Sequence, residues 1–293
     1  MEHPGTLLRK AIQTERPLQI GGVINAFAAK LAEKAGFQAL YLSGAGVANS
    51  KFALPDLGMT SLNDVLEDVT HITNATTLPL LVDADTGWGS PLNISRTFKL
   101  LSESGAAGAH IEDQAESKRC GHREGKHIVS TQEMVGRLKA ALDGRHSEYF
   151  LIMARTDALA SEGIDKTLER ALAYQAAGAE ALFLEAVTEL EQYQAFTRAL
   201  NIPVLANITE FGKTPLFSKQ ALAKVGVSMI LYPLSAFRAM NAVALKVYKT
   251  ILQEGTQESV LGLMQNREDL YQLLNYEKYE QKLESYLKNK ENP

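Results

Sequence analysis

Residues 175–185 read Gln175-Ala176-Ala177-Gly178-Ala179-Glu180-Ala181-Leu182-Phe183-Leu184-Glu185, and this stretch decides the fold. It joins the alanine-rich end of a helix, a glycine, and a short apolar run that finishes in a carboxylate. Glycine just after a last helical turn adopts the left-handed conformation that other residues resist, and the chain then enters the next strand. Similar phrases stand at 33–37 (EKAGF) and 103–107 (ESGAA). The repeat predicts helix-to-strand units and has no catalytic meaning of its own.

Short apolar runs alternate with alanine-rich amphipathic stretches along most of the chain. This alternation is typical of βα units around a parallel sheet. Such units form either a closed barrel or an open doubly wound sheet, and the number of runs together with their polar ends favours a (β/α)8 TIM barrel. The eight runs are Leu18–Val23, Ala39–Ser43, Leu80–Asp83, Gly108–Glu112, Tyr149–Arg155, Ala181–Glu185, Val204–Asn207 and Ser228–Tyr232.

The length of 293 residues fits one large barrel or two smaller domains. We expect a single catalytic barrel domain over residues 1–293, with a C-terminal helical extension from about residue 240. The apolar side chains of this extension either cover the barrel or are exchanged between subunits, and the sequence leaves both alternatives open. They are Leu270, Leu273, Leu274, Leu283 and Leu287.

The composition excludes several classes of protein. A net charge of −4 offers no basic surface for nucleic acid, and the longest apolar runs fall far below the roughly 18 residues of a membrane-spanning helix. The first residues lack the basic and then apolar order of a secretory signal, and one cysteine forms no internal disulfide. We therefore expect a cytoplasmic protein with no nucleic-acid or membrane partner.

The predicted strands finish in residues that carry out chemistry. Because the carboxyl ends of all strands in a parallel barrel share one face, residues distant in sequence meet there in one pocket. These ends are Tyr41-Leu42-Ser43-Gly44, Asp83-Ala84-Asp85, Glu112-Asp113, Arg155-Thr156-Asp157, Glu185 and Asn207-Ile208-Thr209.

Asp83 and Asp85 are separated by one small residue at the end of an apolar strand. Strand alternation puts both carboxylates on one face, where they suit a hard cation such as Mg²⁺. The alternative is a strand end that caps the following helix. Acidic residues at later strand ends favour the metal site.

The segment Lys118-Arg119-Cys120-Gly121-His122 combines a thiol with three basic side chains, on the loop after the strand that ends at Glu112. Nearby cations make a thiol proton easier to lose, which indicates a proton donor. A buried cysteine that only fills space is the alternative, and it is more typical of apolar strands and helices. A Cys/His nucleophile pair is a third interpretation, but no oxyanion-hole motif accompanies it.

These two motifs resemble the metal segment and the signature loop of the isocitrate lyase and phosphoenolpyruvate mutase superfamily. Further matches to its 2-methylisocitrate lyase branch run along the whole chain, and isocitrate lyases proper are considerably longer. The matches are Tyr41-Leu42-Ser43-Gly44-Ala45, Leu54-Pro55-Asp56, Ala154-Arg155-Thr156-Asp157-Ala158, Asn207-Ile208-Thr209-Glu210-Phe211-Gly212, Leu231-Tyr232-Pro233-Leu234-Ser235-Ala236-Phe237-Arg238 and Met264-Gln265-Asn266-Arg267.

The resemblance implies cleavage of (2S,3R)-2-methylisocitrate, a tricarboxylate, into pyruvate and succinate, a step of propionate breakdown through the methylcitrate cycle. It further implies Mg²⁺, with Mn²⁺ as an alternative, a homotetramer, and Cys120 as the donor that protonates the carbanion. Tyr41 is our candidate base. The implied catalytic residues are Tyr41, Lys118, Cys120 and His122, and the implied metal residues are Asp56, Asp83, Asp85 and Glu112.

The resemblance also implies a substrate-binding set of carboxylate-binding groups and an apolar slot for the substrate methyl. Without it, Arg238 and Arg267 would be interpreted as surface arginines, whereas Arg155 directly follows an apolar strand. His110 is interpreted as an interior histidine. The carboxylate-binding set is Ser43, Gly44, Ala45, Gly121, Arg155, Glu185, Asn207, Ile208, Thr209, Arg238 and Arg267, and the slot is Phe183, Leu231 and Pro233.

Two departures from the family pattern concern fine geometry: Leu184 stands where relatives have proline, and Ala45 where they have glycine. Two functional alternatives remain. One is an oxaloacetate hydrolase or another member of the superfamily. The other is a catalytically inert barrel that binds a dicarboxylate.

Overall fold

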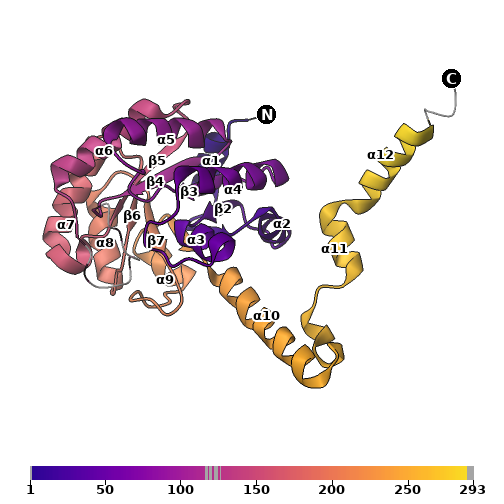
Figure 1. The fold of residues 1–293 in the computed structure, drawn as a ribbon. Coiled ribbons are helices and arrows are strands. Elements are labelled where there is room, and N and C mark those ends of the chain that lie inside the picture. Colours follow the sequence, from indigo (N-terminus) through magenta and orange to yellow (C-terminus); the bar gives the residue numbers. More distant parts are fainter. Residues whose placement is uncertain (1, 116–117, 119–120, 122–124, 126, 289–293) are drawn as a thin grey trace. The chain divides into compact units, whose positions relative to one another are not determined.

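The computed structural model describes residues 2–115, 118, 121, 125 and 127–288, and it contains a closed barrel of eight parallel strands (Figure 1). Each strand pairs with its neighbours in chain order, and β1 pairs with β8 through contacts such as Leu18 with Met229. This pairing confirms the closed barrel over the open sheet. The strands are β1 Leu18–Val23, β2 Ala39–Leu42, β3 Leu80–Asp83, β4 Gly108–Glu112, β5 Leu151–Thr156, β6 Ala181–Leu184, β7 Val204–Asn207 and β8 Met229–Tyr232.

Helices follow the strands and surround the barrel (Figure 1). Those of the barrel are α1 Pro4–Thr14, α2 Ala26–Lys34, α3 Gly44–Phe52, α4 Leu62–Ala75, α5 Pro91–Glu103, α6 Thr131–Gly144, α7 Leu159–Ala176, α8 Leu190–Ala199 and α9 Lys219–Lys224. The chain continues in α10 Ser235–Glu254, the 3-10 helix η1 Glu258–Leu263, α11 Arg267–Leu274 and α12 Tyr276–Lys288.

The three predicted helix-ending glycines adopt left-handed backbone conformations. The φ angles are 96° at Gly36, 87° at Gly105 and 106° at Gly178. After the last of them, the Ala179 amide donates to the Tyr174 carbonyl at 3.0 Å, the backward hydrogen bond that closes such a helix end. The repeated phrase therefore marks the turn from a helix into β2, β4 and β6.

Two apolar cores lie on the two sides of the barrel wall. One fills the space between strands and helices, and Leu42, Val82 and Ile111 belong to it. The other fills the barrel itself, and its strand residues include Tyr41, Phe183 and Leu231. Buried side chains of α1 join this inner core, namely Leu8, Ala11 and Ile12. Since these side chains pack with residues that begin strands, such as Leu18 and Leu151, α1 closes the amino-terminal end of the barrel.

The chain divides into two compact units, Met1–Phe237 and Arg238–Pro293. The first unit holds the barrel, and the second holds most of α10 together with η1, α11 and α12. The boundary lies close to the predicted start of the extension, while the assignment of the whole chain to one domain stays a prediction. Among the helices that the structure describes, none is long and apolar enough to cross a membrane.

Candidate active site

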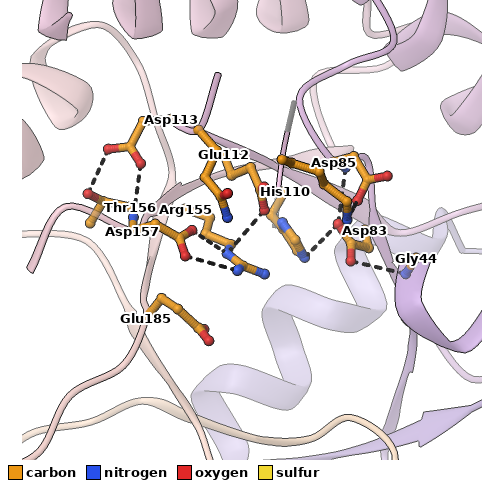
Figure 2. Close-up of polar contacts among 12 residues, drawn as sticks. Gly44, Asp83, Asp85, His110, Glu112, Asp113, Arg155, Thr156, Asp157 and Glu185 are labelled. Carbon is orange, nitrogen blue, oxygen red and sulfur yellow. Dashed lines mark hydrogen bonds and ion pairs between the residues drawn. The ribbon is translucent and has the colours of Figure 1, made fainter. Parts of the chain in front are cut away.

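Charged side chains gather at the carboxyl ends of β3, β4 and β5, as expected from the strand ends (Figure 2). The strand register sets them side by side, because Asp83 is paired with His110, and Glu112 with Arg155. All four side chains are buried. Buried charges are rare unless they are paired or serve a ligand, so this end of the barrel is a candidate active site.

The carboxylate of Asp83 is held by backbone amides. Its Oδ2 accepts from the Gly44 amide at 3.0 Å, and its Oδ1 accepts from the Asp85 amide at 3.0 Å (Figure 2). A side chain at position 44 would collide with this pair, since its Cβ would lie 2.9 Å from Asp85 Oδ1. In this structure the Gly44 amide donates to Asp83, and its assignment to substrate binding stays a prediction.

Asp83 and Asp85 differ in their response to burial. Burial raises the pKa of Asp83, but the opposing positive charges of His110, Lys118 and Arg155 hold this pKa below its ordinary value. Because burial lowers the pKa of His110 to about 4, its ring is uncharged near neutral pH. Lys118 and Arg155 are then the positive charges that keep the Asp83 carboxylate ionised. The pKa of Asp85 is raised to about 7 by burial, with Lys118 opposing and Asp83 adding to the rise.

Lys118 extends from the predicted catalytic loop into this cluster. Its Nζ forms ion pairs with Asp85 and, at 2.8 Å, with the half-buried Asp56. Burial lowers the pKa of Lys118, but Asp85, Asp83, Glu112 and Asp56 outweigh burial and raise it well above its ordinary value. Lys118 therefore supplies a fixed positive charge between two of the predicted metal residues.

Glu112 stands between this cluster and Arg155. Its Oε2 lies 3.2 Å from Arg155 Nε, while its buried Oε1 has no hydrogen-bond partner among the described residues. Burial raises the pKa of Glu112 well above its ordinary value, an effect that Arg155 opposes. An orphaned, buried carboxylate oxygen near two aspartates fits a hard divalent cation, which takes oxygen ligands.

The residue types at this site suit a divalent cation, but the side chains that the structure describes there do not converge on one point. Among the described residues, no three Asp, Glu, His or Cys side chains converge as a ready-made metal site. Lys118 instead bridges Asp56 and Asp85, so its ammonium supplies part of the positive charge that a cation would bring. A divalent ion at Asp83, Asp85 and Glu112 would have to displace that ammonium or share the carboxylates with it.

Tyr41 and His110 form a pair inside the barrel. The Tyr41 hydroxyl lies 2.9 Å from His110 Nε2 and 3.4 Å from Asp83 Oδ2, and the two rings are stacked. Burial raises the pKa of Tyr41 well above its ordinary value, and Asp83 adds to this. Because burial lowers the pKa of His110 to about 4, its ring is neutral at neutral pH, and a bare Nε2 can accept a hydrogen bond from the Tyr41 hydroxyl.

On the other side of Arg155 lie Glu185 and Asn207. Asn207 Nδ2 donates to Glu185 Oε2 at 3.1 Å, and Asn207 Oδ1 is buried without a partner among the described residues. Gly121 approaches both neighbouring charges, because a Cβ there would lie 2.4 Å from Glu185 Oε1 and 2.5 Å from Arg155 Nη2. The predicted residues Gly121, Arg155, Glu185 and Asn207 are thus brought together.

The predicted apolar residues belong to the barrel interior. Phe183 and Leu231 lie in the inner core, and the Phe183 ring centre is 4.9 Å from the Arg155 guanidinium carbon. Pro233 is buried just after β8. By contrast, Ile208 packs in the outer core between barrel and helices, so its side chain faces away from the barrel interior.

The remaining predicted residues divide into three groups. Ser43, Ala45 and Thr209 lie at the carboxyl ends of β2 and β7, with Ser43 as the N-cap of α3. Arg238 and Arg267 lie in the second unit, on α10 and at the start of α11, so their assignment to substrate binding stays a prediction. Cys120 and His122 lie outside the described residues.

Two residues, His110 and Asp157, make contacts in the site that the sequence interpretation did not predict. His110 is an interior histidine, but its ring contacts Tyr41 and Asp83 at the centre of the cluster. Its spacing of two residues from Glu112, on the same strand, was a usable signal, because alternation puts both side chains on one face. Asp157 binds Arg155 through both carboxylate oxygens, at 2.8 and 3.2 Å. The same spacing of two residues at the end of β5 puts Asp157 beside Arg155, but it does not specify that the two side chains form a two-point contact.

The chain matches known sequences over nearly its whole length. Residues 8–252 match the family model described as phosphoenolpyruvate phosphomutase. The 2-methylisocitrate lyase of Vibrio cholerae is 56% identical over 287 residues, covering 96% of this chain and 93% of that protein. The 2-methylisocitrate lyase of Escherichia coli K12 is 56% identical over 286 residues, covering 97% of each.

Solved structures show the same fold. A crystal structure of 2,3-dimethylmalate lyase, described as a PEP mutase/isocitrate lyase superfamily member, aligns with a TM-score of 0.88 at 33% identity, covering 96% of this chain and 94% of that one. Phosphonopyruvate hydrolase in complex with oxalate and Mg²⁺ aligns with a TM-score of 0.86 at 25% identity, covering 98% and 100%. The chain therefore belongs to the phosphoenolpyruvate mutase/isocitrate lyase superfamily, as a carbon–carbon lyase of its 2-methylisocitrate lyase family.

Proposed function

We propose that this enzyme cleaves (2S,3R)-2-methylisocitrate into pyruvate and succinate with the help of Mg²⁺. The observation that carries the proposal is the buried cluster at the carboxyl end of the barrel, where one oxygen of Glu112 pairs with Arg155 and the other has no partner among the described residues. Acidic groups for a cation and a guanidinium for a carboxylate are the two things that a hydroxy-tricarboxylate substrate requires.

Asp83 and Asp85 would hold the cation, with Asp56 and Glu112 contributing directly or through water. A divalent ion supplies Lewis-acid stabilisation for a hydroxyl that loses its proton. The phosphonopyruvate hydrolase relative, whose structure contains oxalate and Mg²⁺, supports this choice of metal. Mn²⁺, which takes similar oxygen ligands, is the alternative.

Cleavage begins when the C2 hydroxyl of the substrate loses its proton. Tyr41 is the candidate base, and because burial raises its pKa well above its ordinary value, it would accept that proton only as a phenolate that the cation or Arg155 stabilises. The C2–C3 bond then breaks, a carbonyl forms at C2 to give pyruvate, and the electron pair passes to C3. There it is delocalised into the adjacent carboxylate.

That carboxylate gains a second negative charge as the bond breaks, and cationic or hydrogen-bonding groups must stabilise it. Arg155, Asn207 and Thr209 are suited to this by position at the ends of β5 and β7, with Arg238 and Arg267 as further candidates. Cys120 then gives its proton to C3 and succinate results. Lys118 and His122 favour the thiolate that is left behind.

Selectivity for the methylated substrate would come from the apolar side chains of Phe183, Leu231 and Pro233. Filling such a slot with one methyl group discriminates by about 10- to 200-fold. We therefore expect weak cleavage of isocitrate, which lacks this methyl group.

The decisive experiment follows pyruvate and glyoxylate separately, from 2-methylisocitrate and from isocitrate, each with Mg²⁺ and with chelator. Metal-dependent pyruvate with little glyoxylate is the expected result and would assign the enzyme to propionate breakdown through the methylcitrate cycle. If the folded enzyme released neither product, the proposed reaction would be wrong. Oxaloacetate would then be the next substrate to try, with oxalate release as the readout.

We also propose that the enzyme is a cytoplasmic homotetramer. Support for an assembly comes from the second unit, which exposes large apolar side chains such as Tyr248, Leu252 and Tyr279. Apolar surface on this scale is typical of an interface between subunits. Sedimentation equilibrium should give four times the monomer mass, and a monomer at all concentrations would contradict the proposal.

A further inference from the structure

Asp157 lies just after β5, and neither the metal nor the substrate proposal uses it. It is buried, and it accepts two hydrogen bonds from the guanidinium of Arg155 (Figure 2). The distances are 2.8 Å from Nε to Oδ2 and 3.2 Å from Nη2 to Oδ1. A two-point contact of this kind fixes the plane of a guanidinium as well as its place.

Arg155 has other anions within reach. Glu112 Oε2 lies 3.2 Å from the same Nε that binds Asp157, and Glu185 is a further source of attraction. The Phe183 ring lies against the guanidinium, with 4.9 Å between its centre and the guanidinium carbon. The contacts with Asp157 and Glu112 involve Nε and Nη2, and no described residue forms a hydrogen bond with Nη1. The grip of Asp157 therefore sets which nitrogen is left for a ligand.

Asp157 is itself fixed by a second carboxylate. Asp113 Oδ1 accepts from the Asp157 amide at 2.9 Å, and Asp113 Oδ2 accepts from the hydroxyls of Thr156 at 2.7 Å and Tyr174 at 2.9 Å. Asp113 directly follows Glu112 at the end of β4, so this contact ties the ends of β4 and β5 together (Figure 2). Tyr174 adds an anchor from α7.

We propose that Asp157 is a positioning residue, which fixes the plane of the Arg155 guanidinium so that Nη1 is presented to the substrate carboxylate. Asp113 and Tyr174 fix the backbone from which Asp157 acts. The inference rests on the proposed function in assigning a substrate carboxylate to Arg155. Without Asp157, only Glu112 and Glu185 hold the guanidinium, so its plane is no longer fixed and Nη1 is no longer directed at the substrate.

The test is Asp157→Asn, which keeps the shape of the side chain and removes its charge. The probe is oxalate in the presence of Mg²⁺, titrated by calorimetry into the full-length enzyme, alongside KM and kcat for 2-methylisocitrate. We expect oxalate affinity to fall about 10- to 100-fold, the range typical of residues that orient a ligand-binding side chain. KM should rise by a similar factor and kcat should change less.

The matched control is Asp143→Asn, because Asp143 is an exposed carboxylate on α6 that pairs with no arginine among the described residues. It should leave oxalate affinity and KM at wild-type values. Oxalate affinity and KM unchanged in the Asp157→Asn variant would overturn the inference, since a purely structural ion pair would change only the melting temperature.

Should Asp157→Asn fail to fold, Tyr174→Phe carries the test, since it removes one hydroxyl from Asp113 and touches no substrate. We expect about a twofold weaker affinity for oxalate, within what one hydrogen bond contributes, and an unchanged affinity would overturn the inference. Oxalate binding also separates the two proposals. A wild-type enzyme that binds oxalate with Mg²⁺ but cleaves no 2-methylisocitrate would refute the proposed reaction. The role of Asp157 could then still be tested by oxalate titration of the Asp157→Asn variant. A wild-type enzyme that binds no oxalate would refute the role of Arg155, and with it this inference.

Discussion

A half-buried carboxylate at one end of the barrel and a buried carboxylate at the other differ in whether their oxygens have bonding partners. At the amino-terminal end, Glu180 precedes β6 and is fully matched: it pairs with Arg9 at 2.9 Å and Arg145 at 3.1 Å, and accepts from the Ile152 amide at 2.9 Å. At the carboxyl end, Glu112 is more deeply buried yet keeps one oxygen without a partner among the described residues. The first arrangement stabilises the fold. The second leaves bonding capacity for a ligand, at the expense of stability.

The largest effect is expected from Cys120→Ser, on the loop that follows the catalytic end of β4. A hydroxyl is a far weaker acid than a thiol, so protonation of the carbanion should slow and kcat should fall by about 10²- to 10⁴-fold. Binding of Mg²⁺ and the melting temperature should stay at wild-type values, because the substitution is nearly isosteric. Unchanged turnover, measured as pyruvate release, would remove Cys120 from the mechanism.

Leu8→Ala should destabilise the amino-terminal end of the barrel. Leu8 is fully buried on α1, inside the barrel's inner core, so its truncation leaves a cavity and costs about 2–5 kcal/mol of unfolding free energy. Denaturant unfolding measures this loss, and kcat at 25 °C should not change. Leu92→Ala, at an exposed position on α5, is the control and should be neutral. A fall in kcat with Leu8→Ala would show that the two ends are coupled.

The fold could be predicted from local pattern more completely than the site. All eight strands were found, since apolar runs and helix-ending glycines are local signals. Errors occurred at strand ends: Tyr149 was counted into β5, but it is exposed and lies within a turn that is closed by the hydrogen bond from the Phe150 amide to the Ser147 carbonyl. Ser43 was counted into β2, but it is the N-cap of α3. Polar residues at these ends read equally well as strand or cap.

Within the site, residue types were predictable and pairings were not. The convergence of Asp83, Glu112 and Arg155 follows from their places at strand ends. Their partners follow from strand register and side-chain reach, which no single run of sequence specifies. For this reason the engagement of Lys118 with Asp85 and the grip of Asp157 on Arg155 emerged only from the structure.

Two matched substitutions, Glu112→Gln and Glu180→Gln, should sharpen the difference between the ends. Burial raises the pKa of the Glu112 carboxyl well above its ordinary value, which means that ionising this buried group costs free energy. Glu112→Gln removes that cost, so in chelator it should increase the unfolding free energy by about 1–3 kcal/mol. Glu180→Gln should decrease it by about 1 kcal/mol, because two arginines lose their partner.

Mg²⁺ should reverse the first of these results, since the wild-type enzyme gains stability from a bound ion and the Glu112→Gln variant gains less. Thermal unfolding with chelator and with Mg²⁺ measures both effects. A destabilised Glu112→Gln variant in chelator would mean that Glu112 is matched as Glu180 is, and the proposed difference between the two ends would fail.

The smallest expected effect concerns Asp64, a well-matched carboxylate in the first turn of α4. Its Oδ2 accepts from the Ser61 amide at 2.7 Å and the Ser61 hydroxyl at 2.8 Å, which completes a capping box and lowers the pKa of Asp64. A carboxyl whose pKa is lower in the folded state stabilises the fold above its unfolded pKa, near 4, and this contribution is lost as pH falls through the folded pKa.

Asp64→Ala should therefore cost about 0.5–1 kcal/mol at pH 7, or about 1–3 °C in melting temperature. The difference from wild type should shrink as pH falls below about 4, because the wild-type carboxyl is then protonated and accepts more weakly. Asp143→Ala, on an exposed face of α6, should show neither the loss nor the pH dependence. An Asp64→Ala difference of equal size at pH 7 and pH 3 would mean that the lost stability comes from contacts other than the charged hydrogen bonds to Ser61.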